Sequence, residues 1–194
     1  MKESEFYLTS PHGNLGSNVS FHGKAGGYTT DINNLEVITA ERAAAEVVNS
    51  NDSLPLLKSA VDALGTPAID HQYIDSAIKQ DPDDQYILWV TQCWDGNDIA
   101  FVTAAGQSFN YAEATVFTYV GANEFMGDSR RYVILPKSHL DTLTRSVFKT
   151  VDINVHTMIR RAGVHYTTPR KPRPISGKTR LNCGGCGRLF WDYN

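Results

Sequence analysis

The sequence predicts an α+β fold of two tandem ββ(β)α repeats with antiparallel sheets, followed by a C-terminal helix and a basic tail that carries a cysteine knuckle. Residues 58–64 read Lys-Ser-Ala-Val-Asp-Ala-Leu, and residues 137–143, 79 positions later, read Lys-Ser-His-Leu-Asp-Thr-Leu. Strand-like segments gather before each helix-like segment, without the alternation that a doubly wound sheet requires. A unit of about 60 residues is only marginally stable alone. We therefore expect the two units to pack into one body.

The same offset relates further positions of the two units. The pairs are Tyr7 and Tyr86, Asn18 and Asn97, Gly27 and Gly106, Thr29 and Ser108, Asp31 and Asn110, Val37 and Val116, Thr39 and Thr118, and Ala43 and Ala122. A fixed internal period is typical of repeated folding units. We therefore divide the chain into a first repeat unit (1–68), a connector (69–85), a second repeat unit (86–149), a helix (150–163) and a basic arm with a Cys-x-x-Cys knuckle (164–194).

In the first unit, the residue pattern indicates three strands and then a helix. Segments 6–9 and 18–21 are apolar or alternate between polar and apolar residues, which is typical of strands. Aromatic and β-branched residues at 28–30 favour a short third strand. Thr39 is expected to cap the helix, because a threonine hydroxyl accepts hydrogen bonds from a helix N-terminus. The polar run 49–53 is expected to end it.

The second unit repeats this order. Segment 86–90 is a strongly apolar strand, Asp95 and Gly96 mark a hairpin turn, and segment 99–103 returns. Thr118 stands where Thr39 stands in the first unit. The sequence also predicts a strand over 131–136, which ends at proline.

Further helices are expected after these strands. Ser138 is predicted to cap a helix whose buried side extends to Val147, and Ser59 is predicted to do the same in the first unit. Residues 151–161 are expected to form a final helix. Three prolines and four basic residues over 167–178 favour an extended arm.

The net charge of −3 hides a strong asymmetry along the chain. Residues 1–158 contain 10 basic and 20 acidic residues, whereas residues 159–194 contain 8 basic residues and Asp192 alone. Such a tail can bind nucleic-acid phosphates or another acidic surface. The alternative is that the tail folds back onto the acidic body of its own chain.

The sequence contains no sign of a membrane segment. Met1-Lys-Glu-Ser-Glu-Phe lacks the features of a signal peptide, and the longest apolar run is far short of the roughly 20 residues that cross a bilayer. We expect a cytoplasmic protein without membrane contact. Three cysteines are too few for a disulfide scaffold in a chain of 194 residues.

Near the C-terminus, Cys183-Gly-Gly-Cys186 resembles the cysteine knuckle of zinc ribbons, in which two thiolates lie on a tight turn of small residues. The resemblance covers about ten residues and implies zinc as a cofactor. A structural zinc takes four ligands, and the chain has no second Cys-x-x-Cys pair. His156 and His165 are the nearest candidates, Cys93 is a more distant one, and a second chain in a homodimer is another source of thiolates. A redox pair and a metal-free tail are the alternatives.

Basic and aromatic residues surround this knuckle. Guanidinium groups bind phosphates and aromatic rings stack on bases, so the mixture favours nucleic-acid binding. The alternative is that Phe190 and Trp191 form a small core over the knuckle. The candidate binding residues are Arg170, Lys171, Arg173, Lys178, Arg180, Arg188 and Trp191.

No set of residues requires an enzyme, and we assign no catalytic residue. His12 and His22 are each followed by glycine, but Thr91 and Phe101 occupy the equivalent positions of the second unit, so we interpret the histidines as structural. Gly177-Lys-Thr179 matches only the end of a P-loop. No nucleophile elbow, zinc-protease motif or kinase signature is present.

Residues 20–39, which include Gly27-Tyr-Thr-Thr-Asp31, resemble a small domain of uncharacterised bacteriophage proteins. The resemblance implies a viral accessory protein in a bacterial cytoplasm and brings no catalytic residues. Our leading hypothesis is a non-catalytic protein that binds nucleic acid or a host nucleoprotein complex through its basic tail. One alternative is an inhibitor of a host defence or transcription protein that acts through the acidic repeat body. Another is a hydrolase with an unrecognised site, which requires a deep pocket of convergent polar groups.

Overall fold

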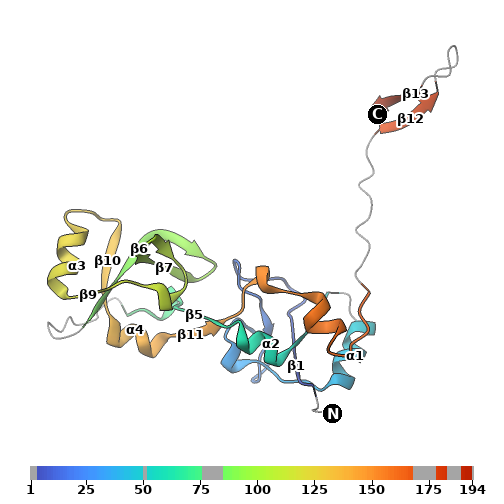
Figure 1. Cartoon of the computed structure of the whole chain (residues 1–194), viewed down its shortest axis with the longest axis horizontal. Coiled ribbons are helices and arrows are strands. Elements are labelled where there is room, and N and C mark those ends of the chain that lie inside the picture. The colour runs from blue at the N-terminus through green and yellow to red at the C-terminus, as the bar shows by residue number, and fades with distance from the viewer. Residues whose placement is uncertain (1–3, 50–51, 76–84, 168–177, 183–188, 194) are drawn as a thin grey trace.

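The computed structural model describes residues 4–49, 52–75, 85–167, 178–182 and 189–193. Figure 1 shows the helices and the antiparallel strand pairs of an α+β protein, which confirms the predicted fold class. Within these residues, no helix is long and apolar enough to cross a membrane.

The first half is made of short strands and helices. Strand β1 pairs antiparallel with β4, and β2 pairs antiparallel with β3. Its elements are β1 (Phe6–Leu8), β2 (Phe21–His22), β3 (Tyr28–Thr29), the 3-10 helix η1 (Ile32–Asn34), α1 (Ala40–Asn49), β4 (Pro55–Leu57), α2 (Lys58–Ala63), β5 (Thr66–Ala68) and the 3-10 helix η2 (His71–Tyr73).

The second half is built on one antiparallel sheet. Its strand order is β10-β6-β7-β8, and β9 pairs with β6. The elements are β6 (Tyr86–Asp95), β7 (Asp98–Thr103), β8 (Gly106–Ser108), η3 (Tyr111–Glu113), β9 (Val116–Phe117), α3 (Tyr119–Met126), β10 (Tyr132–Pro136), α4 (Lys137–Leu143), β11 (Arg145–Val147) and η4 (Thr150–Asp152). The π-helix η5 (His156–Arg160) follows, and β12 (Lys178–Asn182) pairs with β13 (Leu189–Tyr193).

Elements of the two halves recur at the offset of 79 residues. η1 and η3, β5 and β11, and η2 and η4 each coincide at both ends. Local side-chain bonds give the reason, because Asp31 and Asn110 each accept from the backbone N–H two residues later and so start a 3-10 turn. Each half is longer than ββ(β)α, because a strand, a short helix and a further strand follow the first helix.

The predicted helix caps are partly confirmed. The Thr39 hydroxyl accepts from the Arg42 N–H at 3.3 Å, and the Thr118 hydroxyl accepts from the Gly121 N–H at 3.1 Å. The caps at Ser59 and Ser138 are wrong. Helices α2 and α4 begin directly after the extended strands β4 and β10, so each serine already lies inside its helix.

Two other helix predictions also need correction. Val147 lies in β11 and not on α4, because the chain becomes extended at Thr144 to pair with β5. Residues 151–161 do not form one helix. Only Thr150–Asp152 and His156–Arg160 are helical there.

The two halves exchange their last segments. β5 of the first half pairs antiparallel with β11 of the second, and Pro67 stands opposite Ser146 at the centre of the pair. Pro67 and Ser146 are themselves equivalent at the 79-residue offset, so a local twofold axis passes between them. In Figure 1, β5 and β11 lie between the two lobes.

This exchange takes one apolar side chain from each half into the core of the other. Ile69 follows β5 and is fully buried with Ile87, Ile99 and other residues of the second half. Phe148 follows β11 and is fully buried with Phe6, Phe21 and other residues of the first half. Neither core is complete without the other half.

Replacement of Phe148 with alanine should lower the free energy of unfolding by about 3–5 kcal/mol, because it leaves a large cavity in the first core. The loss should also shift the denaturation midpoint reported by Trp89 and Trp94, which lie in the second half. Urea titration followed by tryptophan fluorescence measures it. Val151→Ala is the matched control, since Val151 is 86% exposed. An unchanged tryptophan midpoint in Phe148→Ala would mean that the halves unfold independently.

Candidate functional site

The junction between the halves is held by backbone bonds that follow the exchanged segments. The Val19 N–H donates to the Phe148 carbonyl at 2.8 Å, and the Ile99 N–H donates to the Ile69 carbonyl at 3.1 Å. The acceptors Phe148 and Ile69 are equivalent at the 79-residue offset, and the donors are shifted by one residue from it. The two bonds bring the tips of two hairpins, at residues 17–19 and 95–98, against each other.

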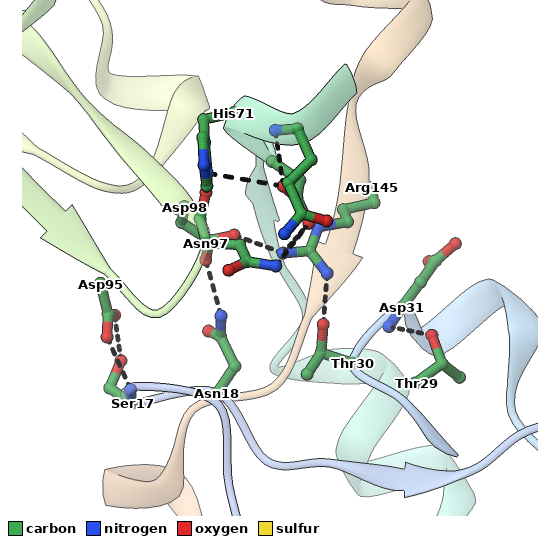
Figure 2. Close-up of polar contacts among 12 residues, drawn as sticks. Ser17, Asn18, Thr29, Thr30, Asp31, His71, Asp95, Asn97, Asp98 and Arg145 are labelled. Carbon is green, nitrogen blue, oxygen red and sulfur yellow. Dashed lines mark hydrogen bonds and ion pairs between the residues drawn. The ribbon is translucent and has the colours of Figure 1, made fainter. Parts of the chain in front are cut away.

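A buried carboxylate lies at the centre of this junction. The Asp98 side chain is fully buried, and its two oxygens contact three groups from other segments. Asn18 Nδ2 donates to Asp98 Oδ2 at 2.7 Å, Arg145 Nη2 donates to Oδ1, and Lys149 Nζ lies 3.7 Å away. Figure 2 shows Asn18 of the first half and Arg145 of the second converging on Asp98. A buried charge with such partners is strongly destabilising once a partner is removed.

A second carboxylate, Asp95, joins the same network. It accepts from the Ser17 N–H at 2.6 Å, from the Ser17 hydroxyl and from Lys149 Nζ at 2.9 Å. Burial raises the pKa of Asp95, but the bonds from Ser17 and Lys149 together outweigh it, and the pKa lies below its ordinary value. The carboxylate is therefore held ionised.

Asp70 is the third carboxylate of the junction. Its oxygens accept from the Gln72 N–H at 2.9 Å and from Asn97 Nδ2 at 3.3 Å, and Arg145 lies 3.7 Å away. His71 Nδ1 lies 3.0 Å from the Asn97 carbonyl oxygen. Arg145 thus lies between Asp70 and Asp98 and also donates to the Thr30 hydroxyl.

A cleft of about 400 Å³ opens beside this network. Tyr28 forms part of its wall, with the rings of His12 and His22 edge-on at 5.0 and 5.1 Å. Asp70 and Arg145 form part of its lining, so both charges there are already paired. The remaining lining residues are Ser10, Gly13, Asn14, Leu15, Ser20, Thr29, Thr30, Gln72, Tyr73 and Asn97.

The cleft has the size of a small-ligand site, and its described side chains do not include a hydroxyl bonded to a histidine ring. Nucleophilic catalysis needs a hydroxyl or thiol within hydrogen-bond reach of a base. Among the described side chains of the cleft, the Ser10 hydroxyl accepts from the His12 backbone, and no histidine ring is bonded to a hydroxyl. His12 and His22 instead pack against Tyr28.

The histidines proposed as zinc ligands both lie at the surface. His156 begins η5, and His165 follows it beside Arg160, Gly163 and Tyr166. Within the part of the chain that the structure describes, no three His, Cys, Asp or Glu side chains form a metal-binding group. Cys183 and Cys186 lie outside the described residues, so zinc at this knuckle stays a prediction.

The predicted binding residues lie mostly outside the described residues. Arg170, Lys171, Arg173 and Arg188 fall there. The backbone of the other three lies in the C-terminal hairpin, with Lys178 and Arg180 in β12 and Trp191 in β13.

Cys93, the distant zinc candidate, belongs to the second half. It is half-buried on β6, and Gln107 Nε2 donates to its sulfur at 3.3 Å. The strand is bulged between Val90 and Trp94, and Gln92 has a positive φ of 61°.

Sequence reasoning missed the junction network. A usable signal was present in the repeat, because Arg145 and Lys149 stand where the first unit has Thr66 and Asp70. Cations that occur at these two positions in only one repeat indicate a contact that the other repeat does not make.

Comparison of the chain with protein-family models, curated proteins and solved structures finds no match.

Asp98→Asn should lower the free energy of unfolding by about 3 kcal/mol, because it leaves the cations of Arg145 and Lys149 without their buried partner. Asp141→Asn is the control. Its carboxylate is 47% exposed, forms an ion pair with Lys137 one helical turn earlier and accepts from the Tyr111 hydroxyl at 2.8 Å, so the loss of these exposed contacts should cost less than about 1 kcal/mol. Urea denaturation at neutral pH measures both variants. Equal losses would show that the Asp98 network contributes no more than a surface ion pair.

Proposed function

We propose that this protein is a non-catalytic binding protein whose basic C-terminal segment binds nucleic acid, alone or in a host nucleoprotein complex. The two-lobed body acts as the scaffold. The register of the C-terminal hairpin is the observation that supports the proposal. The phage resemblance adds a viral accessory role in a bacterial cytoplasm.

The register sorts the hairpin residues into two faces. Lys178 stands opposite Tyr193, and Arg180 stands opposite Trp191. Residues opposite each other, and residues two apart along a strand, fall on the same face of a two-stranded ribbon. These four positions therefore share one face with the pair Asn182 and Leu189, and two of its six positions are cationic and two are aromatic.

The opposite face has another composition. Leu181 stands opposite Phe190, and Thr179 stands opposite Asp192. By register, positions 190 and 191 fall on different faces of the ribbon. A cationic and aromatic ribbon face suits phosphate contacts combined with base stacking.

The charges of the body also favour the tail as the binding element. In the described part of residues 4–158, five of the eight lysine and arginine side chains form ion pairs within the body. The five are Arg42, Lys58, Lys137, Arg145 and Lys149. Most body cations are thus already bound to carboxylates.

The inhibitor hypothesis has less support. Mimicry of nucleic acid needs carboxylates that are free and gathered on one surface. Seven carboxylates of the described body are instead bound to its own cations, and three of these lie inside the junction. The seven are Glu36, Glu46, Asp62, Asp70, Asp95, Asp98 and Asp141.

The proposed tail function predicts a strong salt dependence. Affinity for a fluorescein-labelled single-stranded oligonucleotide should fall steeply between about 50 and 300 mM salt. Replacement of Lys178 and Arg180 together with glutamine should reduce the slope of log Kd against log salt by about 1.4, because two phosphate contacts are lost. Thr179→Ala, on the opposite face by register, is the matched control. Fluorescence anisotropy measures all three, and flat binding over this salt range would reject the proposal.

The zinc proposal predicts a defined metal stoichiometry. Elemental analysis and native mass together should find one zinc per chain, with His156 and His165 as further ligands, or one per dimer, with four thiolates. Cys186→Ser should lose the zinc, and Cys93→Ser should keep it. Purified wild-type protein without zinc would overturn the proposal, as would loss of zinc from the Cys93 variant alone.

A further inference from the structure

We infer that a groove at the outer end of the second half is a second contact surface for single-stranded nucleic acid, which binds a phosphate at Arg130 and Arg131 and a base at Phe125. The inference rests on the proposed function in taking nucleic acid as the partner. It assigns that partner a site on the folded body, separate from the tail.

The groove is formed by two adjoining cavities of about 560 and 430 Å³. Val90, Gln107 and Arg131 line both of them. The cavities lie against β6, the turn between β7 and β8, and the loop from α3 to β10. Nucleic acid can therefore contact the groove without entering the junction between the halves.

The two arginines of this groove differ from the other cations of the body. Five body cations are ion-paired, and Lys24 donates to the Asn33 carbonyl at 2.7 Å. Arg130 and Arg131 have no ion pair with any carboxylate of the described residues, and both are exposed. Two arginines that line one cavity, without an ion pair to a described carboxylate, provide the positive charge and the hydrogen-bond donors that a phosphate requires.

The backbone that carries the arginines is firmly held. The Thr91 N–H donates to the Arg131 carbonyl at 2.8 Å, and the Thr91 hydroxyl donates to the same oxygen at 3.0 Å. Thr91 precedes the positive-φ residue Gln92 in the bulge of β6, and a bulge redirects the side chains beside it. Arg131 Nη2 also donates to Gln107 Oε1 at 3.4 Å, which orients the guanidinium group toward the groove.

An aromatic surface lies beside these cations. Phe125 is 50% exposed, although its ring packs 5.4 Å from that of Phe117 and 5.6 Å from that of Tyr132. The Arg131 guanidinium lies 5.9 Å from the centre of the Tyr132 ring. A ring that is fixed by its neighbours and remains half-exposed provides a stacking surface for a base.

The repeat shows that the fold does not require these residues. At the offset of 79, Phe125 corresponds to Glu46 and Arg131 corresponds to Asp52. The first half thus has two acidic residues where the second half has an aromatic ring and a cation. Phe125 and Glu46 lie within the equivalent helices α3 and α1, and Arg131 and Asp52 follow these helices, so the ring and the cation are features of the second half alone.

The test uses the full-length protein and a fluorescein-labelled oligothymidylate. Arg131→Asp and Phe125→Glu give the second half the residues that the first half has, so the fold should tolerate both. We expect each variant to bind about tenfold more weakly, and Arg131→Asp to reduce the salt slope by about one phosphate contact. Lys24→Asp makes the same charge change on an exposed residue outside the groove and should bind as the wild type does.

Comparison with the tail variant separates this inference from the proposed function. Weaker binding in the groove variants and unchanged binding in Lys178→Gln/Arg180→Gln would support the groove and reject the tail. Unchanged binding in the groove variants with weaker binding in the tail variant would overturn the groove proposal and leave the tail proposal intact. Equal losses of affinity in Arg131→Asp and Lys24→Asp would do the same. Absence of binding by the wild type would reject both. Displacement of the oligonucleotide by polyglutamate at equal charge would also overturn the groove, because it would indicate an acidic peptide as the ligand.

Discussion

The exchange of Ile69 and Phe148 between the two cores is the constraint on which the rest of the structure depends. Each side chain is fully buried. Phe148 of the second half lies in the core of the first, and Ile69 of the first half lies in the core of the second. A half of this size is only marginally stable alone. By completing each other's cores, the halves become one folding unit, and the β5–β11 pair fixes how they meet. The polar junction and its cleft exist only because this pairing holds the two hairpin tips together.

The buried ion network favours pairing of a first half with a second half over pairing of two like halves. Two first halves would place Asp70 on both sides of the junction and would lack the cations of Arg145 and Lys149. Two second halves would bury two copies of the whole set of charges, with two Asp95 and two Asp98 carboxylates beside two Arg145 and two Lys149 cations. In the observed pairing a single set is buried, and Asn18 of the first half donates to Asp98. Buried ionic groups are best attested as devices that specify register and partner. The network therefore favours pairing of the two different halves within one chain.

Sequence patterns predicted the features that depend on local interactions. The α+β class and the caps at Thr39 and Thr118 follow from short-range preferences, and the structure has them. The exchange was not predictable, because β5 contains only three residues and includes Pro67, a weak strand signal. The caps at Ser59 and Ser138 failed for a related reason. A serine before an apolar helical stripe looks like a cap, but here a strand leads directly into each helix.

Comparison of the two repeats distinguishes residues that the fold requires from surface residues that vary between the halves. Equivalent helices α1 and α3 both begin after a threonine cap, because that interaction forms the helix in either half. Side chains on and after these helices differ in charge between the halves, from Glu46 and Asp52 to Phe125 and Arg131. At the junction the divergence is instead complementary, since both halves meet there. Positions that differ in a complementary way thus indicate contact between the halves. Positions that differ away from the junction, such as Phe125 and Arg131, indicate surfaces that have acquired separate roles, and the groove is the clearest of these.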